Sequence, residues 1–318
     1  MTAVLDQKVG TGKASEPRRA LGHAAAWARR APLLPALVFL VIVTQLPFVG
    51  TLVISLLRWN ALNPTDTGFV GIENYITVFS DSNLRDAVLN TIELTVVVIL
   101  VSLVLGLLLA LLLDRKFKGR PVVRTLLIAP FLVVPAASAL LWKHALFNPV
   151  YGLFNGVLTW FGKLFGNEAP VQFDWITTMP KTAVEISLIW QWTPFMMLIL
   201  LAGLQSKPVE AFEAAQVDGA RGWQMFRYLT FPHLRQYMEL AALLGSIYIV
   251  QNFDAVFTIT SGSLGTANLP YAIYETFYRA HDYGVASASG VVVVVGSIVI
   301  ATFALRVVLS LFREEVKA

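Results

Sequence analysis

Long apolar runs separated by short polar segments dominate this chain of 318 residues. Six of these runs are long enough to cross the roughly 30 Å of hydrocarbon in a bilayer as helices. We predict spans at 33–57, 88–113, 122–142, 182–204, 237–259 and 284–312. The pattern therefore predicts an all-α membrane protein with six transmembrane helices and with both termini on the same side.

The polar ends and the apolar middle define the expected organisation. We expect a basic tail over residues 1–31, a transmembrane domain over 32–312 and a short tail over 313–318. The longest polar interruption within the domain is a loop at 206–235, between the fourth and fifth predicted spans.

Lysine and arginine show which side these parts face. Eighteen of the 24 lie in the N-terminal tail, the 115–124 link, the 206–235 loop and residues 306–317, and six lie on the opposite side. Cytoplasmic segments of membrane proteins carry the excess of positive charge. We therefore predict that both termini and the 206–235 loop are cytosolic.

Composition excludes several classes of function. Only 14% of the residues are charged, against about a quarter in soluble domains, and the net charge of +4 needs no nucleic-acid partner because topology explains it. The chain has no cysteine, no G-x-x-x-x-G-K-[ST] loop and no histidines at metal-binding spacing. We expect no catalytic residue, no metal site and no cofactor in this chain.

The 206–235 loop has its own local pattern. Pro208 suits the first turn of a helix, and the alanine-rich run after it favours helix until Gly219 ends or bends it. A second short helix carries Phe226 on a small apolar face and is expected to stop at Pro232. The loop therefore predicts two short helices joined by a glycine elbow at a membrane surface.

The same loop carries a specific resemblance. It matches the EAA loop of permease subunits of bacterial ABC importers at Glu213, Ala214, Ala215, Asp218, Gly219, Ala220, Phe226, Leu229 and Pro232. Three further segments resemble the maltose-type, sugar-importing branch of that family: 69–75, 148–152 and the run Phe253, Phe257, Thr260 and Gly262.

The resemblance implies a type I ABC importer permease fold in a bacterial inner membrane. It also implies a complex with a second permease, two ATPase subunits that bind ATP and magnesium, and an external solute-binding protein that delivers a sugar or polyol. Gly219 would be the elbow, Glu213 and Asp218 polar anchors, and Phe226 the apolar contact with an ATPase. The external loops 58–87 and 260–283 would contact the binding protein.

Aromatic and amide side chains gather in the fourth and fifth predicted spans. Tyr248, Gln251 and Asn252 are spaced at i, i+3 and i+4, which places them on one face of a helix. A ring stacks on the apolar C–H face of a sugar and amides bond its hydroxyl groups, so this face suits a sugar or polyol. The alternative is that the amides bond neighbouring helices, because unpaired amides are costly in lipid.

The resemblance favours a substrate site, because sugar contacts in maltose-type permeases come from the third, fourth and fifth of these spans. The positions similar to those contacts are Phe131, Trp192, Phe195, Tyr248 and Asn252. The full set of candidate substrate-binding residues is Phe131, Trp190, Trp192, Phe195, Tyr248, Gln251, Asn252 and Asp254.

Three further carboxylates lie within predicted spans: Glu93, Glu185 and Glu239. Carboxylates in a membrane are costly and are often functional. They are interpreted either as groups at the interface or bonded to a neighbouring helix, or as a proton relay. No lysine or arginine within the spans is expected to pair with them.

The substrate and the class of transporter have alternatives. Residues 265–271 and 277–283 resemble polyol permeases most, with trehalose or another oligosaccharide as the second interpretation. A secondary transporter would need coupling carboxylates and symmetric broken helices, and a membrane scaffold would need no polar face at the midplane. Neither alternative accounts for the EAA loop.

Overall fold

Helices form almost all of the regular structure in this computed structural model, which describes residues 31–167 and 169–298. Most of the predicted basic tail, the end of the sixth span and the C-terminal tail lie outside the described residues. By their internal contacts, residues 1–50 and 51–318 form two units, and each is described by itself.

The described part of the first unit is a 3₁₀ turn, Ala31–Leu33, and most of helix α2, Leu34–Ser55. Helix α2 is apolar on all sides and its side chains up to Gln45 are exposed. A helix of this kind is stable only where lipid or protein covers it. It confirms the position predicted for the first span.

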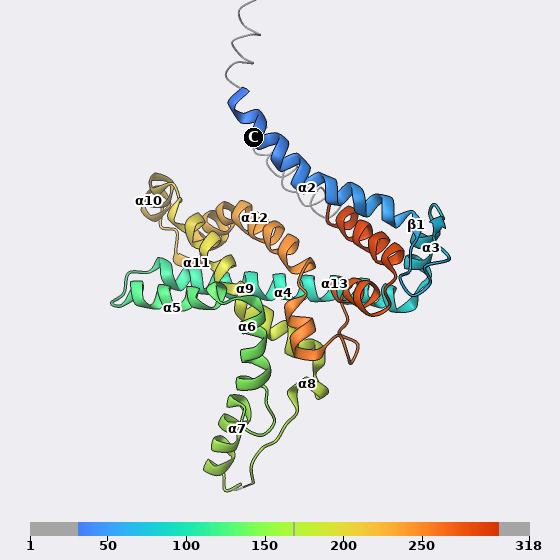
Figure 1. Ribbon diagram of the computed structural model, residues 1–318. Coiled ribbons are helices and arrows are strands. Elements are labelled where there is room, and N and C mark those ends of the chain that lie inside the picture. Colours follow the sequence, from blue (N-terminus) through green and yellow to red (C-terminus); the bar gives the residue numbers. More distant parts are fainter. Residues whose placement is uncertain (1–30, 168, 299–318) are drawn as a thin grey trace, which may run out of the picture. The chain divides into compact units, whose positions relative to one another are not determined.

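The centre of the second unit is a pair of long helices, α4 (Ser82–Asp114) and α9 (Pro180–Gln205). Helix α12 (Phe231–Val250) packs on both (Figure 1). Val98 of α4 and Met196, Met197 and Leu200 of α9 are completely buried. These helices confirm the second and fourth spans, and α4 begins six residues earlier than predicted.

The third predicted span is bent. Helix α5 (Arg120–Leu132) is followed by α6 (Pro135–Leu140) and a π-helical stretch, Leu141–Leu146, and the two parts meet at 97°. Pro135 has no N–H with which to continue the hydrogen-bond pattern, and it disfavours helical geometry at the residue before it. A single helix over 122–142 was therefore the wrong prediction.

The fifth predicted span is also interrupted. Helix α12 ends at Val250, the N–H of Asn252 bonds the Ile249 carbonyl at 2.9 Å, and helical structure resumes before the π-helical stretch Val256–Thr260. The carbonyl of Asn252 accepts a hydrogen bond from Asn268 Nδ2 at 2.5 Å instead of a helical N–H. A continuous helix over 237–259 was therefore wrong.

Shorter elements cover the ends of these helices. They are β1 (Leu57–Arg58) and β2 (Gly68–Phe69), which pair antiparallel, with α3 (Glu73–Ser80), α7 (Leu153–Leu164), α8 (Trp175–Thr178), α10 (Val209–Val217), α11 (Gly222–Met225), the π-helical stretches Phe226–Thr230 and Glu275–Arg279, and α13 (Leu269–Tyr274). A further apolar helix, Tyr283–Ile298, occupies the start of the sixth predicted span.

Within the described residues, three helices are long and apolar enough to cross a membrane, and the bent pair makes a fourth if it counts as one span. The all-α membrane architecture is therefore confirmed. The count of six spans and the side of the termini remain predictions.

The contact between α4 and α9 leaves no room for a side chain at Gly106. A Cβ there would lie 2.9 Å from Met196 Cβ and 2.9 Å from the Met197 backbone nitrogen. We expect Gly106→Ala to destabilise the protein by about 1–3 kcal/mol, because the two helices must separate to accept the methyl group. Thermal unfolding in detergent measures this change.

Gly290→Ala is the matched control, because outside its own helix backbone and chain neighbours no described atom lies within 4 Å of its Cβ position, and alanine favours helix. Equal melting temperatures for the two variants would show that the α4–α9 contact tolerates a wider spacing.

Candidate functional site

Four of the predicted aromatic residues meet in one cluster. Trp192 stacks on Tyr248 of α12, with ring centroids 5.4 Å apart. Phe131, at the end of α5, stacks on Phe195 at 5.4 Å and lies edge-on to Trp192 at 5.7 Å. Trp192 and Phe195 are three residues apart on α9 and share a face. The Tyr248 side is open, since this residue is 58% exposed.

A buried amide fixes the position of Phe131 in this aromatic cluster. Gln191 Nε2 donates to the carbonyl oxygen of Val133 at 3.2 Å, at the break between α5 and α6. A carbonyl freed by a helix break in a membrane needs such a partner. We did not identify Gln191 as a site residue from the sequence. The signal that could have found it is the pair Pro130 and Pro135, since prolines within a span favour a break that a polar group must satisfy.

Asn252 lies beyond the end of α12 and has an unsatisfied group. Its side-chain Oδ1 is buried and has no hydrogen-bond partner in the described part of the chain. Buried polar atoms without partners are rare in folded proteins. A group that donates to this acceptor must therefore reach it inside the break after α12.

The expected shared helical face of Tyr248, Gln251 and Asn252 is wrong. Because α12 ends at Val250, Gln251 and Asn252 leave the helical path, and Gln251 is exposed. The amides therefore do not continue the Tyr248 stripe as the sequence spacing implied.

Two other candidate residues lie outside the aromatic cluster. Trp190 contacts Trp142 edge-on at 5.9 Å, within a second group of rings that includes Phe147, Phe154 and Trp175. Residues two apart on a helix point in nearly opposite directions, so Trp190 and Trp192 cannot share a face. Asp254 is half-buried and has no ring contact, hydrogen bond or ion pair with the described residues of the cluster.

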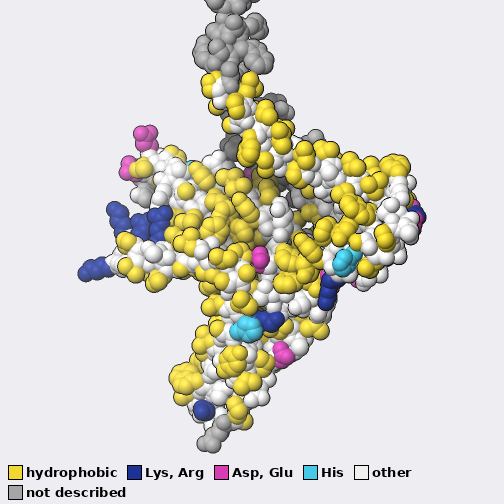
Figure 2. All heavy atoms as spheres, in the orientation of Figure 1, with side chains coloured by type: hydrophobic (Ala, Val, Ile, Leu, Met, Phe, Trp, Pro, Cys, Tyr) yellow, Lys and Arg dark blue, Asp and Glu magenta, His cyan; other side chains and the backbone are white. Residues whose placement is uncertain are grey.

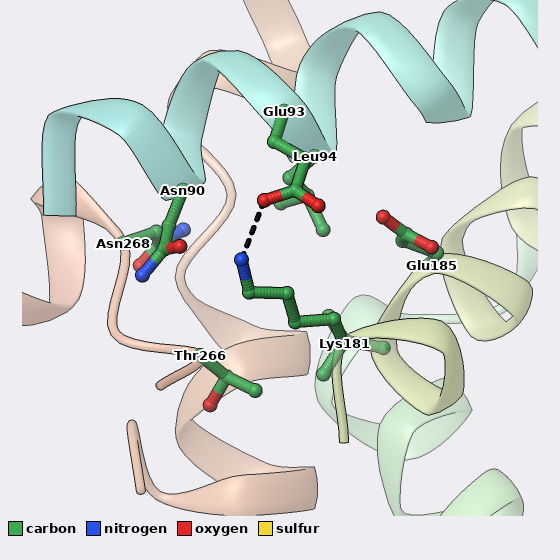
Figure 3. Close-up of a pocket in the computed structure, with 8 residues that line it drawn as sticks. Asn90, Glu93, Leu94, Lys181, Glu185, Thr266 and Asn268 are labelled. Carbon is green, nitrogen blue, oxygen red and sulfur yellow. Dashed lines mark hydrogen bonds and ion pairs between the residues drawn. The ribbon is translucent and has the colours of Figure 1, made fainter. Parts of the chain in front are cut away.

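A small polar pocket joins α4, α9 and the segment before α13 (Figure 3). Lys181 Nζ lies 2.5 Å from Glu93 Oε2, and Glu185 lines the same pocket. Asn90 Nδ2 donates to the carbonyls of Gly265 at 3.0 Å and Ala267 at 2.9 Å. The pocket therefore attaches the segment before α13 to the two central helices.

These contacts bear on the two interpretations of the carboxylates Glu93, Glu185 and Glu239. Glu93 pairs with Lys181, and Glu239 pairs with Arg235 one helical turn away at 3.1 Å. Both basic partners lie near helix ends. The pairing supports carboxylates that bond neighbouring groups, rather than a relay of protons.

The 206–235 loop forms the predicted helix and elbow. Helix α10 begins directly after Pro208 and ends at Val217, and Gly219 has φ +83°, in the left-handed region that glycine adopts without strain. Glu213, Ala214 and Asp218 are exposed, and Ala215 and Ala220 are half-buried. The sequence positions of the EAA loop thus present a surface helix followed by a sharp turn.

The second helix of the loop does not stop at Pro232. Helix α11, the π-helical stretch Phe226–Thr230 and α12 run on without interruption. The N–H of Phe231 bonds the Phe226 carbonyl, five residues back, so the wider turn lets Pro232 begin α12 instead of ending a helix. Pro232 therefore lies at the second position of α12, within a continuous helical run.

An exposed tryptophan accompanies Phe226. Trp223 is 73% exposed and stacks on Phe226 with centroids 5.7 Å apart, whereas Phe226 itself is half-buried. Sequence reasoning identified only Phe226, although Trp223 precedes it by three residues and shares its helical face.

The start of α10 is tied to the central helices. Lys207 Nζ pairs with Asp114 at the end of α4, at 3.0 Å, and lies 5.4 Å from the ring centroid of Phe212. The Ser206 hydroxyl bonds the Tyr237 hydroxyl at 2.6 Å. Movement of the loop would therefore be transmitted to α4 and α12.

Comparison with known proteins gives a consistent result. Residues 102–313 match the family described as binding-protein-dependent transport system inner membrane component. The chain is 36% identical to a probable ABC transporter permease protein, y4oQ, of Sinorhizobium fredii, over 79% of this chain and 80% of that protein.

Two further relatives have named substrates. The trehalose/maltose transport system permease protein MalF of Thermococcus litoralis is 34% identical over 80% of this chain and 85% of that protein. The trehalose transport system permease protein SugA of Mycobacterium tuberculosis is 32% identical over 81% of each.

A solved structure has the same fold. A chain of a bacterial ABC transporter involved in import of the acidic polysaccharide alginate aligns with a TM-score of 0.75 over 90% of this chain and 96% of that one, at 24% identity. At that identity the match concerns the fold alone.

The α12 break depends on Asn268, which is 1% exposed and also accepts the Tyr271 N–H at 3.2 Å. We expect Asn268→Ala to destabilise the protein by about 1–3 kcal/mol, because the Asn252 carbonyl and the Tyr271 N–H lose their partner. Thermal unfolding in detergent tests this expectation. Asn83→Ala is the control, since Asn83 is exposed and its side chain makes no hydrogen bond to a described residue; equal melting temperatures would contradict the role of Asn268.

Proposed function

The chain belongs to the family of inner membrane components of binding-protein-dependent transport systems, and from this premise we propose that it carries a sugar across the membrane past the aromatic cluster of Phe131, Trp192, Phe195 and Tyr248. It is a non-catalytic permease subunit of an ABC importer, with the type I importer fold. Family membership removes the secondary-transporter and scaffold alternatives.

The observation that carries the proposal is the open ring surface of this cluster. Sugars present flat apolar C–H faces that stack on aromatic rings, and the exposed side of Tyr248 supplies such a surface. The unpartnered Oδ1 of Asn252 adds an acceptor for a sugar hydroxyl. Gln251, Trp190 and Asp254 are not part of this proposed site.

We propose a disaccharide of the trehalose or maltose type as the substrate. Two relatives at 34% and 32% identity are named for trehalose or maltose. The polyol expected from residues 265–271 and 277–283 has no support in these relatives, and we replace it. The local resemblance of a short external loop was a weaker guide than similarity over four-fifths of the chain.

The proposed complex contains a second permease, two ATPase subunits that bind ATP and magnesium, and an external binding protein. The 206–235 loop contacts an ATPase through α10 and the Trp223–Phe226 pair. Loops 58–87 and 260–283 contact the binding protein. In this proposal the tails 1–31 and 313–318 flank the transmembrane domain 32–312 on the cytosolic side.

The deciding experiment is the ATPase activity of the purified complex in lipid, with a panel of sugars and polyols each loaded on the binding protein. We expect trehalose or maltose to stimulate hydrolysis and Gly219→Pro to abolish the stimulation. Proline requires φ near −65°, whereas Gly219 has φ +83° and its N–H bonds the Gln216 carbonyl.

Gly222→Pro is the matched control for that experiment. Gly222 is the first residue of α11, where proline is tolerated, and Arg221 before it is already extended. Normal stimulation in Gly219→Pro would refute the coupling role of the elbow. Activity indifferent to every loaded sugar would refute the proposed function.

A second prediction concerns the substrate site. We expect Tyr248→Ala with Asn252→Ala to raise the KM for transport tenfold or more, since about 1–3 kcal/mol of stacking and hydrogen bonding is removed. Basal ATPase activity should not change, because neither residue touches the coupling loop. Uptake of labelled sugar into proteoliposomes measures the effect.

Tyr248→Phe serves as the control, because it keeps the ring and removes only the hydroxyl group. If the double variant transported sugar with an unchanged KM, the aromatic cluster would be helix packing and the site would lie elsewhere.

A further inference from the structure

The link between α4 and α5 is strongly basic. Five of the ten residues from 115 to 124 are lysine or arginine: Arg115, Lys116, Lys118, Arg120 and Arg124. All are exposed except Arg120, which is half-buried. We call this set the basic turn. Figure 2 shows Lys and Arg side chains gathered at the end of the molecule where α5 begins.

No acidic group of the described chain neutralises the basic turn. Its five side chains form no ion pair and no hydrogen bond with any residue that the structure describes. The adjacent carboxylate, Asp114, is already paired with Lys207 at 3.0 Å. The exposed acids of α10, Glu210 and Glu213, make no ion pair with the turn either.

Three cations near the opposite ends of the helices, in contrast, form ion pairs within the chain. Arg58 pairs with Glu73 at 2.8 Å, Lys181 with Glu93, and Arg279 with Glu275 at 2.8 Å. The Arg58 guanidinium, hydrogen-bonded to the Glu73 carboxylate, has its pKa raised by that contact. These three cations are thus compensated within the chain, whereas none of the five in the basic turn has an acidic partner among the described residues.

The basic turn borders apolar surface rather than open polar surface. Leu112 precedes it, Phe117 lies between two of its lysines, and Val122 and Leu126 follow on α5; all four side chains are exposed. Since α4 is a membrane-spanning helix, this is the boundary between hydrocarbon and water. A ligand here meets positive charge and apolar side chains together.

We propose that the basic turn binds the phosphate-bearing headgroups of anionic phospholipids. Ammonium and guanidinium groups donate charge-assisted hydrogen bonds to phosphate oxygens, and basic clusters beside a membrane span attract anionic lipid. The exposed apolar residues favour a lipid over free phosphate, because the acyl chains cover Val122 and Leu126 while the headgroup meets the cations. An acidic protein surface would leave these apolar side chains uncovered.

The test uses the full chain purified with equal mole fractions of phosphatidylglycerol and phosphatidylcholine. Native mass spectrometry then counts the lipids that remain bound. We expect selective retention of phosphatidylglycerol, and K116Q/K118Q should lower that selectivity by roughly tenfold or more, since each cation contributes about fivefold. R85Q/K163Q is the matched control, because both residues are exposed and unpaired among the described residues.

Three outcomes would overturn the proposal: unchanged selectivity in K116Q/K118Q, equal loss in R85Q/K163Q, or displacement of the lipid by excess inorganic phosphate. The last would mean that the turn binds a free anion. Size-exclusion chromatography shows whether K116Q/K118Q is folded. If it is not, the wild-type chain alone tests the proposal, because equal retention of phosphatidylglycerol and phosphatidylcholine would refute the site.

Discussion

The constraint on which this structure depends is that backbone polar groups in hydrocarbon need a partner. Two helices break within the membrane part of the chain, after Leu132 and after Val250, and each break leaves a carbonyl that a buried amide satisfies. Gln191 bonds Val133, and Asn268 bonds Asn252. Phe131 and Tyr248 lie just before these two breaks. The positions of these rings in the aromatic cluster therefore depend on two hydrogen bonds between residues that are not themselves aromatic.

Sequence reasoning predicted what depends on neighbours along the chain. Spans one, two and four, the helix after Pro208 and the turn at Gly219 follow from local composition and backbone preference. The rings of the aromatic cluster were identified because of their residue types and the family resemblance.

What the sequence did not predict depends on residues far apart in the chain. Gln191 donates a hydrogen bond to the carbonyl of Val133, 58 positions earlier, and Lys181 pairs with the carboxylate of Glu93, 88 positions earlier. A periodic apolar pattern does not show where a distant amide makes a break tolerable. It therefore indicated straight helices over 122–142 and 237–259, and a shared face for Tyr248 and Asn252 that the end of α12 removes.

The described chain contains four π-helical stretches, and the one at Phe226–Thr230 lies between the elbow and α12. A π-turn holds one residue more than an α-turn, and one residue of an α-helix corresponds to a rotation of about 100°. The wider turn takes up one additional residue while keeping α11 and α12 nearly in phase, whereas a residue lost from a neighbouring α-helical turn would rotate α11 relative to α12 by about 100°. The rotational phase between the 206–235 loop and the ring surface thus depends on the number of residues in this segment, which makes it less tolerant of changes in length than of changes in side chain.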